Sequence, residues 1–190
     1  MEINMKEIWI DLETTGLNPD KDTIIEIACI FPTDKGDDIF HKYCLPDEKP
    51  ENFQNISKLT GITWEFLEEN GFKEDVLFSL FLNWLDGIIS KYNKNDKAIL
   101  CGYNVLGFDS KFLRKLFYRN CNNFYGSYFY SPSFDVFSKI AEELKDENIP
   151  QLPSYNLKSC CDFFNIDFMA HSAIADIQAT IELYKKLKGE

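Results

Sequence analysis

The chain has 190 residues, a formal net charge of −11 and a sequence pI near 4.7. Hydrophobic residues make up 45% and charged residues 27%, which are the proportions of a globular domain and exclude an intrinsically disordered chain. No apolar run approaches the roughly 20 residues that a membrane-spanning helix needs. The first residues form neither a basic segment nor an apolar one of the secretory type. We therefore expect a single cytoplasmic domain over residues 1–190 that has no contact with a membrane.

Three strands are predicted in the first quarter of the chain. Apolar and β-branched residues fill the segments 7–13, 23–31 and 39–45. Turn residues separate the first two segments at 14–19, and a hairpin-type sequence separates the last two at 33–37. These three strands are predicted to form an antiparallel meander.

The apolar periodicity becomes helical after residue 60. A short helix begins near Thr63, and a second apolar stripe follows over 76–88. Residues 98–102 are continuously apolar, as in a strand that is buried on both faces. Further helices are predicted over 110–120, 134–144, 156–164 and 172–187. Antiparallel strands followed by alternating helices and strands predict a mixed α/β fold with one central sheet.

The charge is unevenly distributed along the chain. Residues 91–120 hold seven basic and two acidic side chains, although the protein as a whole is acidic. A solvated helix face is the ordinary explanation of such a basic block. The alternative is a place where the phosphates of a nucleic acid approach the protein.

Two carboxylates alternate near the end of the first strand. Asp11 and Glu13 project from one face, together with Trp9, because side chains two residues apart in a strand point the same way. Neighbouring carboxylates repel each other unless a cation lies between them, and Mg²⁺ prefers oxygen ligands of this kind. The alternative is that both residues only mark a strand end that enters a turn.

Three more candidate site residues follow predicted strand and helix ends. Asp109 lies just beyond the buried strand 98–102, where an open α/β sheet commonly binds ligands, although a helix-capping role is also open. His171 and Asp176 begin the last helix, where the histidine could act as a general base beside a metal. Their ordinary explanations are a structural histidine and an acid that satisfies the helix dipole.

These segments together resemble the 3′–5′ exonucleases of the DnaQ-like, DEDD superfamily, in the subtype that uses a histidine. The motifs are Asp11–Leu17, Asn104–Asp109 and His171–Asp176, with further landmarks at 25–28, 59–63 and 155–158. The resemblance covers nearly the whole chain. Tyr103 stands where a histidine is common, and the second motif is one residue longer than in bacterial proofreading subunits, which leaves the subfamily open.

The resemblance implies a ribonuclease H-like fold and the release of nucleoside 5′-monophosphates from the 3′ end of single-stranded or frayed DNA. It implies two Mg²⁺ or Mn²⁺ ions, with His171 taking a proton from the attacking water. The metal ligands implied are Asp11, Glu13, Asp109 and Asp176. The residues implied to bind substrate are Thr14, Thr15, Leu17, Asn104 and Phe108, with backbone N–H groups on the 3′-hydroxyl and Leu17 wedged against the terminal base.

Several alternatives stay open at this point. The same residues suit an RNA-trimming, oligoribonuclease-like enzyme. A catalytically silent binding subunit is a further hypothesis, and the partner could be a DNA polymerase or a second copy of the chain. The aromatic segment 124–130 could stack on bases or pack beneath a loop.

The implied mechanism ranks two substitutions. Asp176→Ala removes a metal ligand and is expected to lower kcat more than His171→Ala, since a general base contributes about 10²–10⁴-fold. Hydrolysis of a labelled oligonucleotide measures both variants. Loss of all activity in the histidine variant, with most activity kept in the aspartate variant, contradicts the assignment.

Overall fold

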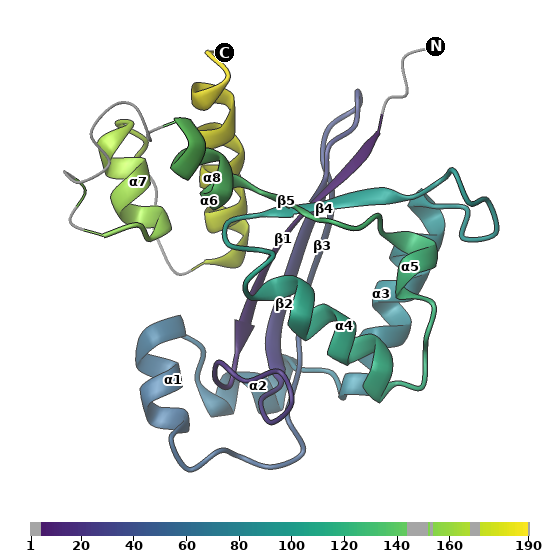
Figure 1. The fold of residues 1–190 in the computed structure, drawn as a ribbon. Coiled ribbons are helices and arrows are strands. Elements are labelled where there is room, and N and C mark those ends of the chain that lie inside the picture. The colour runs from purple at the N-terminus through teal and green to yellow at the C-terminus, as the bar shows by residue number, and fades with distance from the viewer. Residues whose placement is uncertain (1–4, 144–151, 153, 168–171, 190) are drawn as a thin grey trace.

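A computed structural model describes residues 5–143, 152, 154–167 and 172–189 (Figure 1). Five strands form one sheet in the order β3-β2-β1-β4-β5. The strands are β1 (Lys6–Thr14), β2 (Ile24–Phe31), β3 (Asp38–Tyr43), β4 (Ala98–Gly102) and β5 (Phe134–Asp135). Neighbours among β1, β2 and β3 pair antiparallel, whereas β4 runs parallel to β1 and β5 parallel to β4. The predicted meander and mixed central sheet are confirmed.

Helices cover both faces of this sheet. They are α1 (Phe53–Thr60), α2 (Trp64–Asn70), α3 (Glu74–Ile88), α4 (Asp109–Arg119), α5 (Tyr125–Tyr128), α6 (Val136–Glu143), α7 (Leu157–Phe163) and α8 (Ala173–Leu187). Figure 1 shows α3, α4 and α5 on one side of the sheet, α6, α7 and α8 on the other, and α1 and α2 beyond the arrowhead of β1. Within the described part of the chain, no helix has the length and apolar character needed to cross a bilayer.

The central strand β1 divides the protein into two apolar cores. Ile8, Ile10 and Leu12 are buried in the core that contains α3 and α4. Trp9 faces the other core, where its ring lies 5.8 Å from that of Tyr184 on α8. Because Asp11 follows Trp9 at a spacing of two, it projects from the same face and lies beside the start of α8.

Two elements differ from the sequence prediction. The helix expected over 134–144 begins two residues later, because Phe134 and Asp135 pair with β4 as a strand. Two residues are too few to show the alternation by which a strand is recognised. Helix α1 was not predicted, and its stability comes from Phe53 and Ile56, which are buried in a small third core beside β2.

The aromatic segment 124–130 belongs to the interior. Tyr125, Tyr128 and Phe129 are buried in the same core as Phe117 of α4, whose ring lies 5.4 Å from that of Tyr125. Packing, rather than base stacking, therefore accounts for these rings. Phe124 alone among the large rings named here is exposed.

Gly102, the last residue of β4, allows β4 to approach β1 closely. A Cβ atom at this position would lie 2.8 Å from the carbonyl oxygen of Ile10. We predict that Gly102→Ala lowers the free energy of unfolding by about 1–3 kcal/mol, because backbone atoms must move to remove the clash. Chemical denaturation measures the change.

The matched control is Gly87→Ala in α3, where a Cβ atom would meet no other atom within 4 Å. This variant is expected to gain about 0.5–1 kcal/mol, since alanine is the better helix former. Equal stability of the two variants contradicts the close approach of β4 to β1.

Candidate active site

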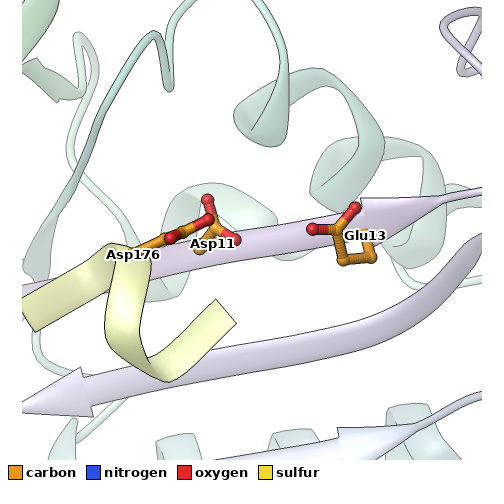
Figure 2. Close-up of side chains that lie close together, drawn as sticks. All are labelled: Asp11, Glu13 and Asp176. Atoms are coloured by element: carbon orange, nitrogen blue, oxygen red, sulfur yellow. The ribbon is translucent and has the colours of Figure 1, made fainter. Parts of the chain in front are cut away.

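The first two site carboxylates come from one strand. Asp11 and Glu13 extend from the same side of β1, as Figure 2 shows. Both side chains are only partly buried, although the strand itself lies in the centre of the sheet. The alternation expected from the sequence therefore places two acids side by side at the open end of β1.

The third carboxylate comes from the opposite end of the chain. Asp176 lies in the first turn of α8 and meets the two acids of β1 (Figure 2). One carboxylate oxygen from each of Asp11, Glu13 and Asp176 can be chosen so that all three lie within 4.8 Å of one another. Such a group of oxygen atoms can hold one hard divalent cation.

The fourth carboxylate reaches the site from the other helical layer. Asp109 is the first residue of α4, and only 3% of its surface is exposed. It lines a cleft of about 510 Å³ together with Asp11, Glu13 and Asp176. The cleft thus brings together all four acids that the motifs singled out.

Burial and mutual repulsion disfavour the charged forms of these acids. Burial, followed by the charges of Asp109 and Asp176, raises the pKa of Asp11 well above its usual range. Burial and the charge of Glu26 raise the pKa of Glu13 to about 7. Burial also raises the pKa of Asp109, against the opposing effect of backbone N–H groups.

This donor set fits divalent cations. Its oxygen ligands are those that Mg²⁺, Mn²⁺ and similar ions prefer, and a bound cation relieves the repulsion that raises each pKa. Without a cation, the fold holds like charges together in a partly buried cleft at a cost in stability.

Asp135 organises the loop that leads to Asp109. Its Oδ1 accepts hydrogen bonds from the N–H groups of Asn104, at 2.9 Å, and Phe137, at 3.0 Å. Its Oδ2 accepts from the N–H of Leu106 at 3.1 Å. Sequence reasoning missed this residue because its strand is only two residues long. A single apolar residue, Phe134, precedes Asp135 after Ser131-Pro132-Ser133, so no apolar run marked the strand.

The loop also has special backbone geometry. Asn104 adopts a left-handed φ of 57°, which asparagine tolerates better than most residues. A Cβ atom on Gly107 would lie 2.3 Å from the Oδ1 atom of Asn104, so a larger residue at position 107 would displace that side chain. Asn104 and Phe108 both line the cleft, as expected of substrate-binding positions.

Tyr103 connects this loop to α7. Its hydroxyl donates to the carbonyl oxygen of Tyr155 at 2.6 Å and lies 3.1 Å from Sγ of Cys160. Its ring lies 5.7 Å from that of Phe137. Tyr103, Phe137 and Tyr155 all line the cleft, so an aromatic wall flanks the carboxylates.

The remaining predicted substrate residues lie in the turn after β1. Thr14 donates its hydroxyl to the carbonyl oxygen of Gly16 at 2.6 Å. Thr15 is buried, and its backbone N–H donates to the carbonyl oxygen of Thr23 at 2.9 Å. This N–H is therefore already used within the fold and is not available to the 3′-hydroxyl. Leu17 is 85% exposed, as a side chain that contacts a ligand must be.

A partly buried contact between a histidine and a glutamate lies beside Glu13. Glu26 is opposite Glu13 in the pairing of β1 with β2, and its carboxylate is 2.6 Å from Nε2 of His41. Each of these two residues looked isolated in the sequence, and only the pairing of β2 with β3 brings them together.

Several basic side chains of the block 91–120 contact other parts of the protein. Lys91 pairs with Asp86 at 2.7 Å, and Lys115 pairs with Asp20. The Arg119 guanidinium lies 3.0 Å from Glu74, while Arg114 stacks 4.1 Å from the ring centre of Tyr125. Lys111, two residues after Asp109, is exposed, and the approach of phosphates beside Asp109 stays a prediction. His171, the predicted general base, lies outside the described residues.

Proteins of known family are similar to this chain over nearly its whole length. A family model described as "Exonuclease" matches residues 8–184. Exodeoxyribonuclease I of Buchnera aphidicola subsp. Schizaphis graminum is 29% identical over 205 residues, which cover 98% of this chain and 40% of that protein. Oligoribonuclease of Haemophilus ducreyi is 30% identical over 191 residues, which cover 95% of this chain and 92% of that protein.

Solved structures agree. The zinc-bound complex of Escherichia coli exonuclease I with single-stranded DNA superimposes with a TM-score of 0.77 and 26% identity, covering 98% of this chain and 41% of that chain. The fold and the carboxylate cleft define a nuclease domain of the ribonuclease H-like class. The chain belongs to the exonuclease family, within the DnaQ-like, DEDD superfamily that its motifs resemble. It spans about two fifths of the length of its exodeoxyribonuclease I relatives.

The raised pKa values predict how stability depends on pH. A carboxyl group whose pKa rises on folding keeps its proton in the folded state after the unfolded chain has released it. Its contribution to stability is therefore complete below the unfolded pKa and is lost as pH rises through the folded pKa. For Glu13 this window runs from the ordinary glutamate pKa of 4.5 to the raised pKa of about 7. The Tm of the metal-free protein in a chelator is expected to fall between about pH 5 and about pH 8.

Added Mn²⁺ should raise Tm more at the higher pH, because the acids bind it in their charged form. Glu13→Gln should reduce the slope of Tm against pH. Glu69→Gln, at an exposed position on α2, serves as the control and should leave the slope as in the unmodified protein. A Tm that is constant or rising across this window contradicts the prediction.

Proposed function

We propose that this chain is a metal-dependent 3′–5′ exonuclease that removes nucleoside 5′-monophosphates from the 3′ end of single-stranded or frayed DNA. The observation that carries the proposal is the convergence of four carboxylates from β1, α4 and α8 in one cleft. Membership of the exonuclease family supports it. So does the likeness to a structure of exonuclease I that holds single-stranded DNA.

Asp11, Glu13, Asp109 and Asp176 would hold the metal. When bound, two Mg²⁺ or Mn²⁺ ions would neutralise charge on the attacking and leaving oxygens of the phosphodiester. The family depends on metal, and the E. coli relative has been solved with zinc. Our choice of Mg²⁺ or Mn²⁺ rests on the all-oxygen donor set, because zinc sites commonly include nitrogen or sulfur ligands.

His171 would act as the general base. In this proposal it takes the proton of the attacking water, and the support is its position in the motif, five residues before Asp176 in the sequence. The carboxylates would hold the metal ions beside the phosphodiester, and the imidazole would accept the proton at one ring nitrogen.

The substrate would lie along the cleft with its 3′ end near β1. Leu17 would contact the terminal base, with Asn104 and Phe108 lining the path of the preceding nucleotides. Thr14 and Thr15 would shape the turn. The protein's acidic charge favours a grip on a few terminal nucleotides rather than on a long duplex.

An RNA substrate is the second candidate. It is favoured by the oligoribonuclease relative, since the alignment covers 92% of that protein, in contrast to the 40% covered of exodeoxyribonuclease I. The carboxylates would serve either polymer, because they act on the phosphodiester common to both.

We place this activity in one domain over residues 1–190 and in the cytoplasm, where its six free cysteines would stay reduced. A DNA polymerase or a second copy of the chain stays a prediction as its partner.

The test is hydrolysis of 5′-labelled single-stranded DNA and RNA of equal sequence with Mg²⁺ or Mn²⁺. We expect a ladder of products shortened one nucleotide at a time from the 3′ end. Asp11→Asn should lower the rate at least about 10³-fold, as expected when a charge that holds the metal is lost. Comparison of the two polymers decides between the two candidates.

Asp162→Asn is the matched control, since Asp162 is an exposed acid on α7 that pairs with Lys158 and does not line the cleft. It should retain full activity. Absence of digestion of either polymer with either ion would overturn the proposal and favour a catalytically silent binding subunit.

A further inference from the structure

The turn between β1 and β2, residues 15–23, is closed at its base. The N–H of Thr15 donates to the carbonyl oxygen of Thr23, and the N–H of Thr23 donates to Oγ1 of Thr15, both at 2.9 Å. We call residues 15–23 the wedge loop, because it carries the exposed Leu17. These two bonds fix only the ends of the wedge loop. The position of its tip, which includes Leu17, depends on further contacts.

The wedge loop is also folded tightly on itself. Oδ2 of Asp22 accepts the N–H of Asn18 at 2.8 Å, and a Cβ atom on Gly16 would lie 2.5 Å from the same carboxylate. The N–H groups of Lys21 and Asp22 both donate to the carbonyl oxygen of Asn18. A loop with so many internal bonds moves as one body, so a contact at one side of it determines where Leu17 lies.

Arg119, at the end of α4, makes that contact. Its Nη1 donates to the carbonyl oxygens of Asp22, at 3.1 Å, and Pro19, at 3.5 Å. Its Nη2 and Nε face the two oxygens of Glu74 at 3.0 and 3.2 Å, a bidentate arrangement that fixes the guanidinium plane. Lys115, one turn earlier on α4, pairs with Asp20 of the wedge loop.

Glu74 anchors the arginine from a second direction. The carboxylate accepts the hydroxyl of Thr23 at 3.2 Å and the side-chain amide of Asn120 at 3.4 Å. Arg119 and Glu74 are each somewhat more than one quarter exposed, so solvent only partly screens the pair. Glu74 therefore fixes the orientation of the Arg119 guanidinium independently of its contacts with the wedge loop.

Helix α4 thus has a role at each end. Asp109, its first residue, is a carboxylate of the cleft, and Arg119, its last, holds the wedge loop. An α-helix of this length is a rigid rod of about 16 Å, so α4 connects Asp109 to the wedge loop independently of β1.

We propose that Arg119 is a positioning residue that sets the place of Leu17 relative to the carboxylate cleft and thereby the affinity for the 3′-terminal nucleotide. This inference rests on the proposed exonuclease function. Arg119 contacts neither the cleft nor its carboxylates, so it acts through the wedge loop alone.

A double-mutant cycle tests the proposal. KM and kcat are measured on single-stranded DNA for Arg119→Ala, Leu17→Ala and the double variant. Arg119→Ala should raise KM about tenfold with kcat changed less than about twofold, because it loosens binding and leaves the carboxylates in place. The double variant should be no worse than Leu17→Ala alone, since both changes remove the same contact.

Arg119→Lys should fall between the unmodified enzyme and the alanine variant, because an ammonium cannot make the same forked contact. The control is Arg114→Ala on the same helix, whose guanidinium stacks on Tyr125 and contacts no residue of the wedge loop. KM should be unchanged in the control. An unchanged KM in Arg119→Ala, or effects of the two changes that multiply in the double variant, overturns the inference.

Hydrogen exchange gives a readout that does not need activity. Amides of the wedge loop should exchange about tenfold faster in Arg119→Ala than in the unmodified protein, with β1 amides unaffected. Equal exchange in the wedge loop overturns the inference even if the enzyme is active. Absence of hydrolysis by the unmodified protein instead refutes the proposed function. In that case the exchange rates alone test whether Arg119 holds the wedge loop.

Discussion

Repulsion among carboxylates that share one cleft is the constraint around which this protein is built. Burial and neighbouring charges raise the pKa of Asp11 and Glu13, so the site is unfavourable in the absence of a cation. Apolar contacts elsewhere on the same strand offset the free energy that this repulsion costs. Trp9 packs against α8, while Ile8 and Ile10 pack toward α3 and α4. The strand that carries the acids is thus held from both faces, and the acids remain close together whether or not their charges favour it.

The two helical layers each deliver one carboxylate to the open end of this strand. Helix α8 brings Asp176 from one side of the sheet, and α4 brings Asp109 from the other. Each is positioned by its own core, and the short strand β5 links the layers through Asp135, which binds three backbone N–H groups near the start of α4 and α6. A metal site assembled in this way depends on the packing of the whole sheet, which explains why its residues are spread over most of the chain.

The net charge of −11 does not show where the acidic and basic side chains lie. Four acids lie in the cleft, and much of the basic block 91–120 is paired with other acids or stacked on aromatic rings. Lys115 and Arg119 of α4 contact residues 15–23, and Arg114 stacks on Tyr125, so these three side chains stabilise neighbouring segments of the domain. An aromatic wall with Tyr103 and Phe137 flanks the acids, which suits contact with bases over a short stretch.

Local patterns in the sequence predicted four of the five strands and most helices, and motifs singled out the four acids. Alternation in β1 placed Asp11 and Glu13 on one face, and this follows from backbone geometry alone. Motif order suggested Asp109 and Asp176. Tertiary structure decided the rest: that β5 pairs with β4 and aims Asp135 at a distant loop, that Glu26 meets His41 across two strands, and that Arg119 holds residues 15–23. Each of these contacts joins residues between 15 and about 100 positions apart, or depends on a strand too short to show a period. A local sequence pattern indicates which conformation a segment prefers. The partner of a buried charged residue depends instead on how distant elements pack together, and no single segment contains that information.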